Sequence, residues 1–207
     1  MEIFIETFNP GPNVLTLAFV GTLIAEMVQS RNFIVRHQHI ARLMTGREIH
    51  SGFYSYFGFS AGAVSAYGLA KGSLALTIGG GCSLLSLFCA LAILRLGQVN
   101  FKGLIIAAFC LLGIPAMTIF PAKDLAFLAI GLVVGYSLVK EAKEAWQDQL
   151  RPRRTWPEMI SGFIASTFWL AYGNAANIWS LQVLYWIFSL TWMSLILAGI
   201  HFRRRKE

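Results

Sequence analysis

Residues 14–33 read VLTLAFVGTLIAEMVQSRNF, an apolar stretch with only two charged residues, Glu26 and Arg31. A helix needs about 20 predominantly apolar residues to cross the ~30 Å of hydrocarbon in a bilayer. Further apolar stretches of comparable length follow at residues 53–70, 73–94, 103–120, 125–139, 159–173 and 178–200. The sequence therefore predicts an all-α, polytopic membrane protein with seven transmembrane helices.

The cationic residues fall almost entirely on one side of this seven-span pattern. Seven crossings place the two termini on opposite sides, and successive loops alternate between the sides. One side holds only Lys71 and Lys123, whereas the other collects fifteen of the seventeen Lys and Arg residues. Those fifteen are Arg31, Arg36, Arg42, Arg47, Arg95, Lys102, Lys140, Lys143, Arg151, Arg153, Arg154, Arg203, Arg204, Arg205 and Lys206. Because cytoplasmic loops carry the excess of Lys and Arg, we expect the N-terminus outside and the C-terminus in the cytoplasm.

The composition is typical of a chain surrounded by lipid. Of its 207 residues, 56% are hydrophobic and 13% are charged, which leaves too little polar surface for a soluble domain. The net charge of +7 follows from the bias between loops and from attraction to anionic lipid. We therefore expect the lipid bilayer as a partner and no nucleic acid. Glu2 and Glu6 stand where a cleavable signal peptide has a cationic region, so the first span is expected to be retained.

The seven spans divide into three, one and three. We place a first three-helix repeat at residues 1–97, a linker helix at 98–123 and a second three-helix repeat at 124–207. In each repeat the second span ends with Tyr-Gly and the third begins with Ser-Leu. These dipeptides are Tyr67-Gly68, Ser73-Leu74, Tyr172-Gly173 and Ser180-Leu181. The linker restores the orientation, so the repeats would be parallel and related by an axis along the membrane normal.

This layout resembles the SWEET sugar transporters and the wider PQ-loop group of membrane proteins. The resemblance covers the whole chain. It rests on the three-one-three layout, the external N-terminus, the short connections between second and third spans, and the Tyr-Gly pairs. It implies a bundle with a central pathway between the repeats. In that family a Trp from the second helix lies near the pocket. Here only the second repeat offers one, Trp169, while Val64 or Ala66 would stand nearby in the first.

Glu26 is the one carboxylate within an expected span. An ionised carboxylate at the centre of a bilayer costs at least ~2.5 kcal/mol, so intramembrane acids usually face a cavity or a partner. Glu26 lies twelve residues after Val14, or about 18 Å along a helix, which is past the midplane toward the cytoplasm. Two interpretations stay open. Glu26 is a proton-coupling residue on a solute path, or it pairs with Arg31 or another cytoplasmic base and anchors the helix.

The last two spans carry aromatic and amide residues that suit a solute pocket. Gln182 and Trp186 are four residues apart, and Ser189 follows three later, so the three share one helix face. A flat indole ring stacks, and an amide both donates and accepts, which suits a polyhydroxylated or heterocyclic solute. We take Tyr67, Trp169, Gln182, Trp186 and Ser189 as candidate substrate-binding residues. The alternative for such residues is an aromatic belt at the membrane surface.

The sequence does not favour an enzymatic function. The histidines His37, His39, His50 and His201 lie on or near the cytoplasmic side, and no intramembrane His or Asp accompanies Glu26. We therefore expect no catalytic residues, no metal and no cofactor.

The expected function is transport of a small polar solute, sugar-like or heterocyclic, by alternating access, and it would be coupled to protons if Glu26 faces the solute path. The alternative is a non-transporting receptor or an accessory subunit of a membrane complex. In that case the charged stretches 31–47 and 140–154 would form the contact surface. Assembly with further copies of the chain is left open.

Overall fold

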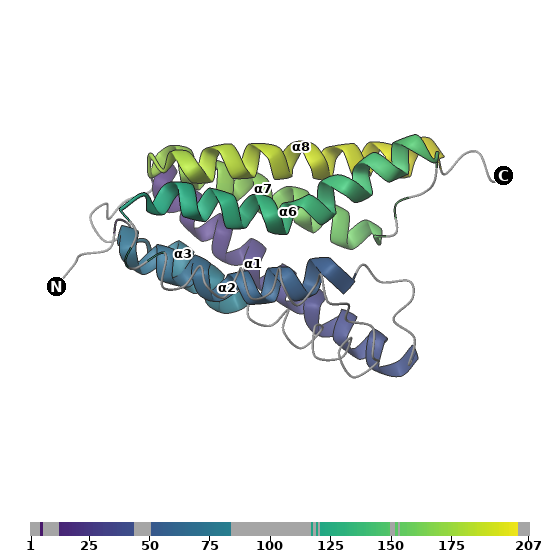
Figure 1. The fold of residues 1–207 in the computed structure, drawn as a ribbon, viewed down its shortest axis with the longest axis horizontal. Coiled ribbons are helices and arrows are strands. Elements are labelled where there is room, and N and C mark those ends of the chain that lie inside the picture. The colour runs from purple at the N-terminus through teal and green to yellow at the C-terminus, as the bar shows by residue number, and fades with distance from the viewer. Residues whose placement is uncertain are drawn as a thin grey trace.

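The computed structural model describes residues 5, 13–43, 51–83, 117, 119, 121–149, 152 and 154–202. Within these residues the secondary-structure elements are all helices, and they run along the long axis of the molecule (Figure 1). They are α1 (Val14–Leu43), α2 (Ser51–Lys71), α3 (Leu74–Ser83), α6 (Lys123–Gln147), α7 (Trp156–Ala175) and α8 (Trp179–His201). The prediction of an all-α chain is confirmed for the described residues. Most of the expected linker span and the second half of the third span lie outside them.

Three of the described helices are long and apolar enough to cross a membrane. They are α1 over Val14–Asn32, α6 over Lys123–Gln147 and α8 over Trp179–His201. The chain is thus compatible with a membrane protein, but the expected count of seven spans is not reached among the described residues. Helices α2 and α7 have 21 and 20 residues but are not among these three.

Large apolar side chains cover the outside of the helices. On α8 the exposed ones follow a stripe at helical spacing, Val183, Trp186, Leu190, Met193 and Leu197. Monomeric soluble proteins rarely expose apolar patches of this extent. The outward-facing stripe is what a helix in contact with lipid requires.

The described helices form two sets of three, α1 to α3 and α6 to α8. In each set the third helix packs between the other two. α3 contacts both α1 and α2, and α8 contacts both α6 and α7. The sets meet where α1 contacts α7 and where α2 contacts α6. The first helix of each set therefore contacts the second helix of the other, which is the pattern expected of two units related by a twofold axis.

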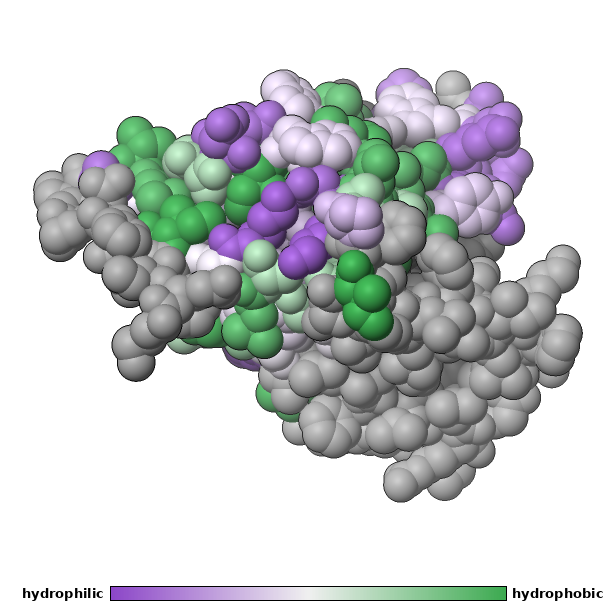
Figure 2. Space-filling model, turned by 60° about the vertical axis from the view of Figure 1, so that its left-hand side comes forward, coloured by the Kyte–Doolittle hydropathy of each residue, from purple (hydrophilic) through white to green (hydrophobic). Residues whose placement is uncertain are grey.

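The turns between the second and third helices of each set share one backbone conformation. Gly72 and Asn177 take φ values of 65° and 55°, the left-handed conformation in which many helices end. The next N–H, of Ser73 or Ile178, donates to the carbonyl five residues back at 2.8 or 2.9 Å. Both turns lie at the same end of the bundle, here called the turn end (Figure 1). Figure 2 brings that end forward and shows hydrophilic residues gathered among hydrophobic ones.

Candidate functional site

A cavity of about 60 Å³ lies between α1 of the first set and α7 and α8 of the second. Most of its lining surface is apolar, but we call it the polar cavity because charged, amide and hydroxyl side chains also line it. A site for one water needs at least roughly 10–15 Å³, so this cavity has room for several. Its polar lining consists of Glu26, Gln29, Asn32, Arg154, Glu158, Ser161 and Ser166. Its aromatic lining consists of Trp169, Tyr185, Phe188 and Trp192. Both sets of helices thus contribute side chains to one cavity.

At the buried end of the cavity, a hydrogen bond joins the two sets of helices. The indole Nε1 of Trp169 donates to Glu26 Oε1 at 2.8 Å. Glu26 is 5% exposed and Trp169 is 2% exposed. The second carboxylate oxygen of Glu26, Oε2, has no hydrogen-bond partner within the described part of the chain. The Tyr185 ring stacks on the Trp169 ring, with centroids 5.6 Å apart and planes 15° apart.

The glycines of α3 leave room for this pair. A Cβ atom on Gly79 would lie 2.7 Å from the Trp169 ring and 3.8 Å from Cγ of Glu26. A Cβ on Gly80 would lie 2.3 Å from Oγ of Ser65 in α2, whereas one on Gly81 would meet nothing within 4 Å. Two of the three consecutive glycines therefore allow close packing, and Gly79 lets the Trp169 ring reach Glu26.

The cavity opens at the end opposite the turns, here called the open end. Asn32, Glu158 and Ser161 are partly exposed there, whereas Glu26 and Trp169 are buried. Asn32 Nδ2 donates to Ser161 Oγ at 2.9 Å, which ties α1 to α7 beside the opening. Glu158 belongs to a capping box with Thr155 that starts α7.

A buried ion pair supports the open end. Arg154 Nε donates to Glu141 Oε2 at 2.9 Å, and the two side chains are 7% and 4% exposed. The guanidinium carbon of Arg154 also lies 5.2 Å from the centre of the Trp192 ring. The segment before α7 is thereby held to both α6 and α8.

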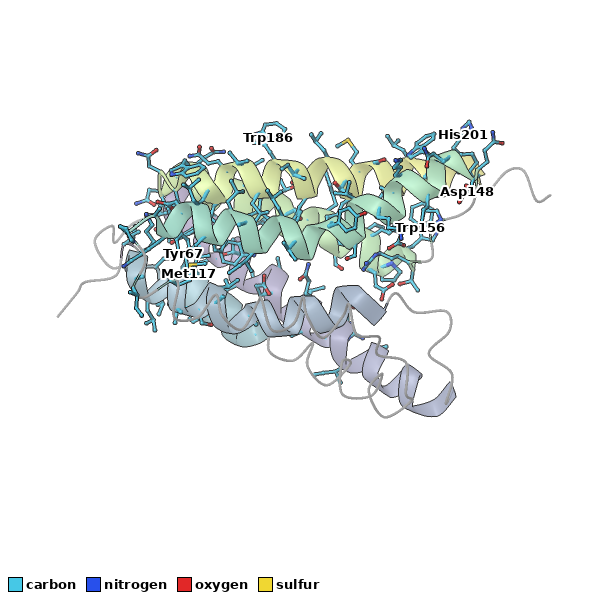
Figure 3. The ribbon with its side chains drawn as sticks, viewed as in Figure 1. Tyr67, Met117, Asp148, Trp156, Trp186 and His201 are labelled. Carbon is cyan, nitrogen blue, oxygen red and sulfur yellow. The ribbon has the colours of Figure 1, made fainter. Side chains whose placement is uncertain are left out.

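The turn end is closed by a group of polar side chains that we call the tyrosine network. Tyr67 OH is hydrogen-bonded to Asp124 and, at 2.8 Å, to Ser180 Oγ. Lys71 Nζ forms an ion pair with Asp124 Oδ2 at 2.8 Å. In the equivalent position of the other set, the hydroxyl groups of Tyr172 and Ser73 are 2.7 Å apart. Both tyrosines are fully buried. Each tyrosine of a Tyr-Gly pair therefore contacts the serine of the other set, and Figure 3 places Tyr67 near this end.

The structure brings some of the candidate site residues together. Glu26 and Trp169 meet in the polar cavity, and Tyr67 lies in the tyrosine network. Gln182 uses its amide locally, donating from Nε2 to the Gly173 carbonyl at 3.2 Å. Trp186 is 56% exposed and points away from the bundle (Figure 3).

Ser189 is buried but does not belong to the cavity lining. The face of α8 that lines the cavity carries Tyr185, Phe188 and Trp192 instead of Gln182, Trp186 and Ser189. The sequence analysis singled out neither Gln29 nor Asn32 on α1. Their spacing of three from Glu26 and from each other is a helical signal that would have found them.

Among the described residues, no group of three or more His, Cys, Asp or Glu side chains is placed to hold a metal ion. No protein-family model, curated protein or solved structure matches the chain.

Proposed function

We propose that the chain is an integral membrane transporter that moves a small polar solute by alternating access between two three-helix units. The observation that carries the proposal is the polar cavity, which is lined by helices of both sets and has a buried carboxylate at its closed end. An accessory subunit has no need of such a cavity between its helices and would be expected to fill the space with side chains.

The proposed layout has seven spans in two parallel repeats, as in the SWEET and PQ-loop proteins, with the N-terminus outside. The exchanged helix contacts and the matching turns support such a repeat. The turn end would face outside, because Arg154, Lys140 and Lys143 lie toward the opposite end. The present conformation is then closed to the outside by the tyrosine network and open toward the cytoplasm.

Transport requires a second conformation in which the tyrosine network separates and the open end closes. Interfaces and packed cores of this kind have discrete arrangements, so a rigid movement of one set against the other is the expected change. Glu26 would be the proton-coupling residue, because it is the buried carboxylate at the point where the sets meet.

The test is the accessibility of a cysteine placed in the cavity. Ser166 is buried and lines the cavity, and we expect Ser166→Cys, with Cys82, Cys89 and Cys110 replaced by Ala, to react with an impermeant maleimide from both membrane faces. Reaction from the cytoplasmic face should be faster, since the cavity opens there in this conformation. The measurement is labelling in sealed vesicles of either orientation.

Two exposed positions serve as controls for sidedness. Asp148→Cys near the open end should react only from the cytoplasm, and Asn174→Cys at the turn end only from outside. Labelling of Ser166→Cys from a single face would contradict alternating access and favour a receptor or accessory subunit. Reversal of both controls would invert the proposed orientation.

A further inference from the structure

We infer that the solute is a small organic cation, a quaternary or protonated amine whose charge lies against Glu26 and the aromatic wall of the polar cavity. This inference rests on the proposed function and names the class of solute for that same site. It departs from the neutral, sugar-like or heterocyclic solute expected from the sequence, because the carboxylate of Glu26 and the ring faces around the cavity favour a cation.

The first support is the incomplete pairing of Glu26. Its Oε1 atom accepts one hydrogen bond from a neutral indole, and its Oε2 atom has no partner in the described structure. Buried charges in proteins are normally paired with an opposite charge. Arg154, the cation in the cavity lining, pairs with Glu141, and Lys71 at the turn end pairs with Asp124. A cationic solute would supply the missing countercharge.

The second support is the balance of charge around the cavity. Glu26, Glu158 and Arg154 line it, and the charge of Arg154 is matched by Glu141 just behind it. Of the two carboxylates in the lining, Glu26 is the one with an oxygen that lacks a hydrogen-bond partner among the described residues. A neutral solute would leave the Glu26 carboxylate without a countercharge, and an anionic solute would be repelled by it.

The third support is the aromatic wall. Trp169, Tyr185 and Phe188 line the cavity beside Glu26, and cations bind over the faces of such rings, within about 6 Å of the ring centre. Trp192 of the same wall already has a cation over its ring, the guanidinium of Arg154.

A polyhydroxylated solute would instead need several polar groups to recognise its hydroxyls. Asn32 and Ser161 are hydrogen-bonded to each other, and the Glu158 carboxylate accepts a hydrogen bond from the Thr155 backbone N–H. These three of the polar lining groups would have to give up existing hydrogen bonds before they could bind a sugar, whereas Oε2 of Glu26 is available without such a cost.

The experiment compares choline with its carbon isostere, in which carbon replaces the quaternary nitrogen. Binding to the purified, full-length protein in nanodiscs is followed by the change in Trp fluorescence, since Trp169 lies beside Glu26. Choline should bind about tenfold or more tightly than the isostere, because the two have the same shape and differ only in charge. This comparison uses the unaltered protein and does not depend on how any variant folds.

Glu26→Gln tests the residue itself. The side-chain carbonyl of the introduced Gln can still accept the hydrogen bond from Trp169. The variant therefore removes the charge and keeps that hydrogen bond. It should reduce choline binding to the level of the isostere. Glu144→Gln, which removes the same charge from α6 outside the cavity, should leave the preference for choline intact.

Equal binding of choline and its isostere, or no binding of choline, would overturn the inference. If glucose alone bound and Ser166→Cys reacted from both faces, the transporter would stand and its solute would be neutral. If choline bound through Glu26 and Ser166→Cys reacted from one face only, the cation site would stand and the transport proposal would fall.

Discussion

Replacing Arg154 with Ala should lower the free energy of unfolding by about 3–5 kcal/mol, because it leaves the buried Glu141 carboxylate without its countercharge. The Glu141 side chain is 4% exposed, and its Oε1 atom already has no hydrogen-bond partner among the described residues. The variant also loses the contact between the guanidinium group and the Trp192 ring. Equilibrium denaturation in mixed micelles measures the change.

The neighbouring pair of Lys140 and Glu144 provides the control. Its charges are 3.6 Å apart, and the side chains are 53% and 33% exposed. Lys140→Ala should therefore change the stability by no more than about 0.5 kcal/mol. Replacing Arg154 and Glu141 together by Met and Leu should recover most of the loss, since no buried charge then lacks a partner. An equal loss in the single and double variants would show that packing, not charge, accounts for the effect.

Tyr67→Phe should shift the protein toward the conformation that is open at the turn end. Without the hydroxyl, Asp124 and Ser180 each lose a hydrogen-bond partner in the closed conformation. The loss of such a buried bond costs about 1–3 kcal/mol. A cost of 1.4 kcal/mol changes the ratio of the two conformations about tenfold. The measurement is the rate at which Ser166→Cys reacts with an impermeant maleimide from outside.

Tyr136→Phe is the matched control for that experiment. Tyr136 lies on α6 and is 68% exposed, so the loss of its hydroxyl should leave the labelling rate unchanged. If Tyr67→Phe also left the rate unchanged, the tyrosine network would not be the barrier at the turn end.

The positions of the helices could be predicted from local sequence. Apolar stretches long enough to span a bilayer coincide with α1, α6 and α8, and the paired Tyr-Gly and Ser-Leu dipeptides mark the two equivalent turns. The exchange of tyrosine contacts between the sets was not predictable. Tyr67 and Ser180 are 113 residues apart. The sequence around each residue does not indicate which helix ends lie side by side.

The face of α8 that lines the cavity could not be predicted for a related reason. This helix is apolar on all sides, so its sequence does not distinguish the face that meets the other helices from the face that meets lipid. Gln182 and Trp186 were predicted as binding residues because one is polar and the other aromatic. The Gln182 amide instead donates a hydrogen bond to the Gly173 carbonyl, and the Trp186 indole faces outward. The rotation of α8 is set instead by its packing on α6 and α7.

Glu26 was predictable as a site residue from the cost of a carboxylate in hydrocarbon. The hydrogen-bond partner of Glu26 was not predictable. Arg31 was the nearest candidate in the sequence, whereas the hydrogen bond observed is to Trp169, 143 residues away on α7. The space for that contact depends on Gly79 of α3, so the pair requires three helices that are distant in sequence.

The relative movement of the two sets is tested most directly by the distance between spin labels at the turn end. Leu69 and Asn174 are exposed, lie on α2 and α7, and precede the two equivalent turns. Pulsed electron–electron double resonance on Leu69→Cys with Asn174→Cys in nanodiscs should give two distance populations, the longer one enriched by Tyr67→Phe. Labels at Asn174 and Val183, both within the second set, should give one distance that Tyr67→Phe does not change. A single distance for Leu69 and Asn174 that is likewise unchanged by Tyr67→Phe would contradict alternating access.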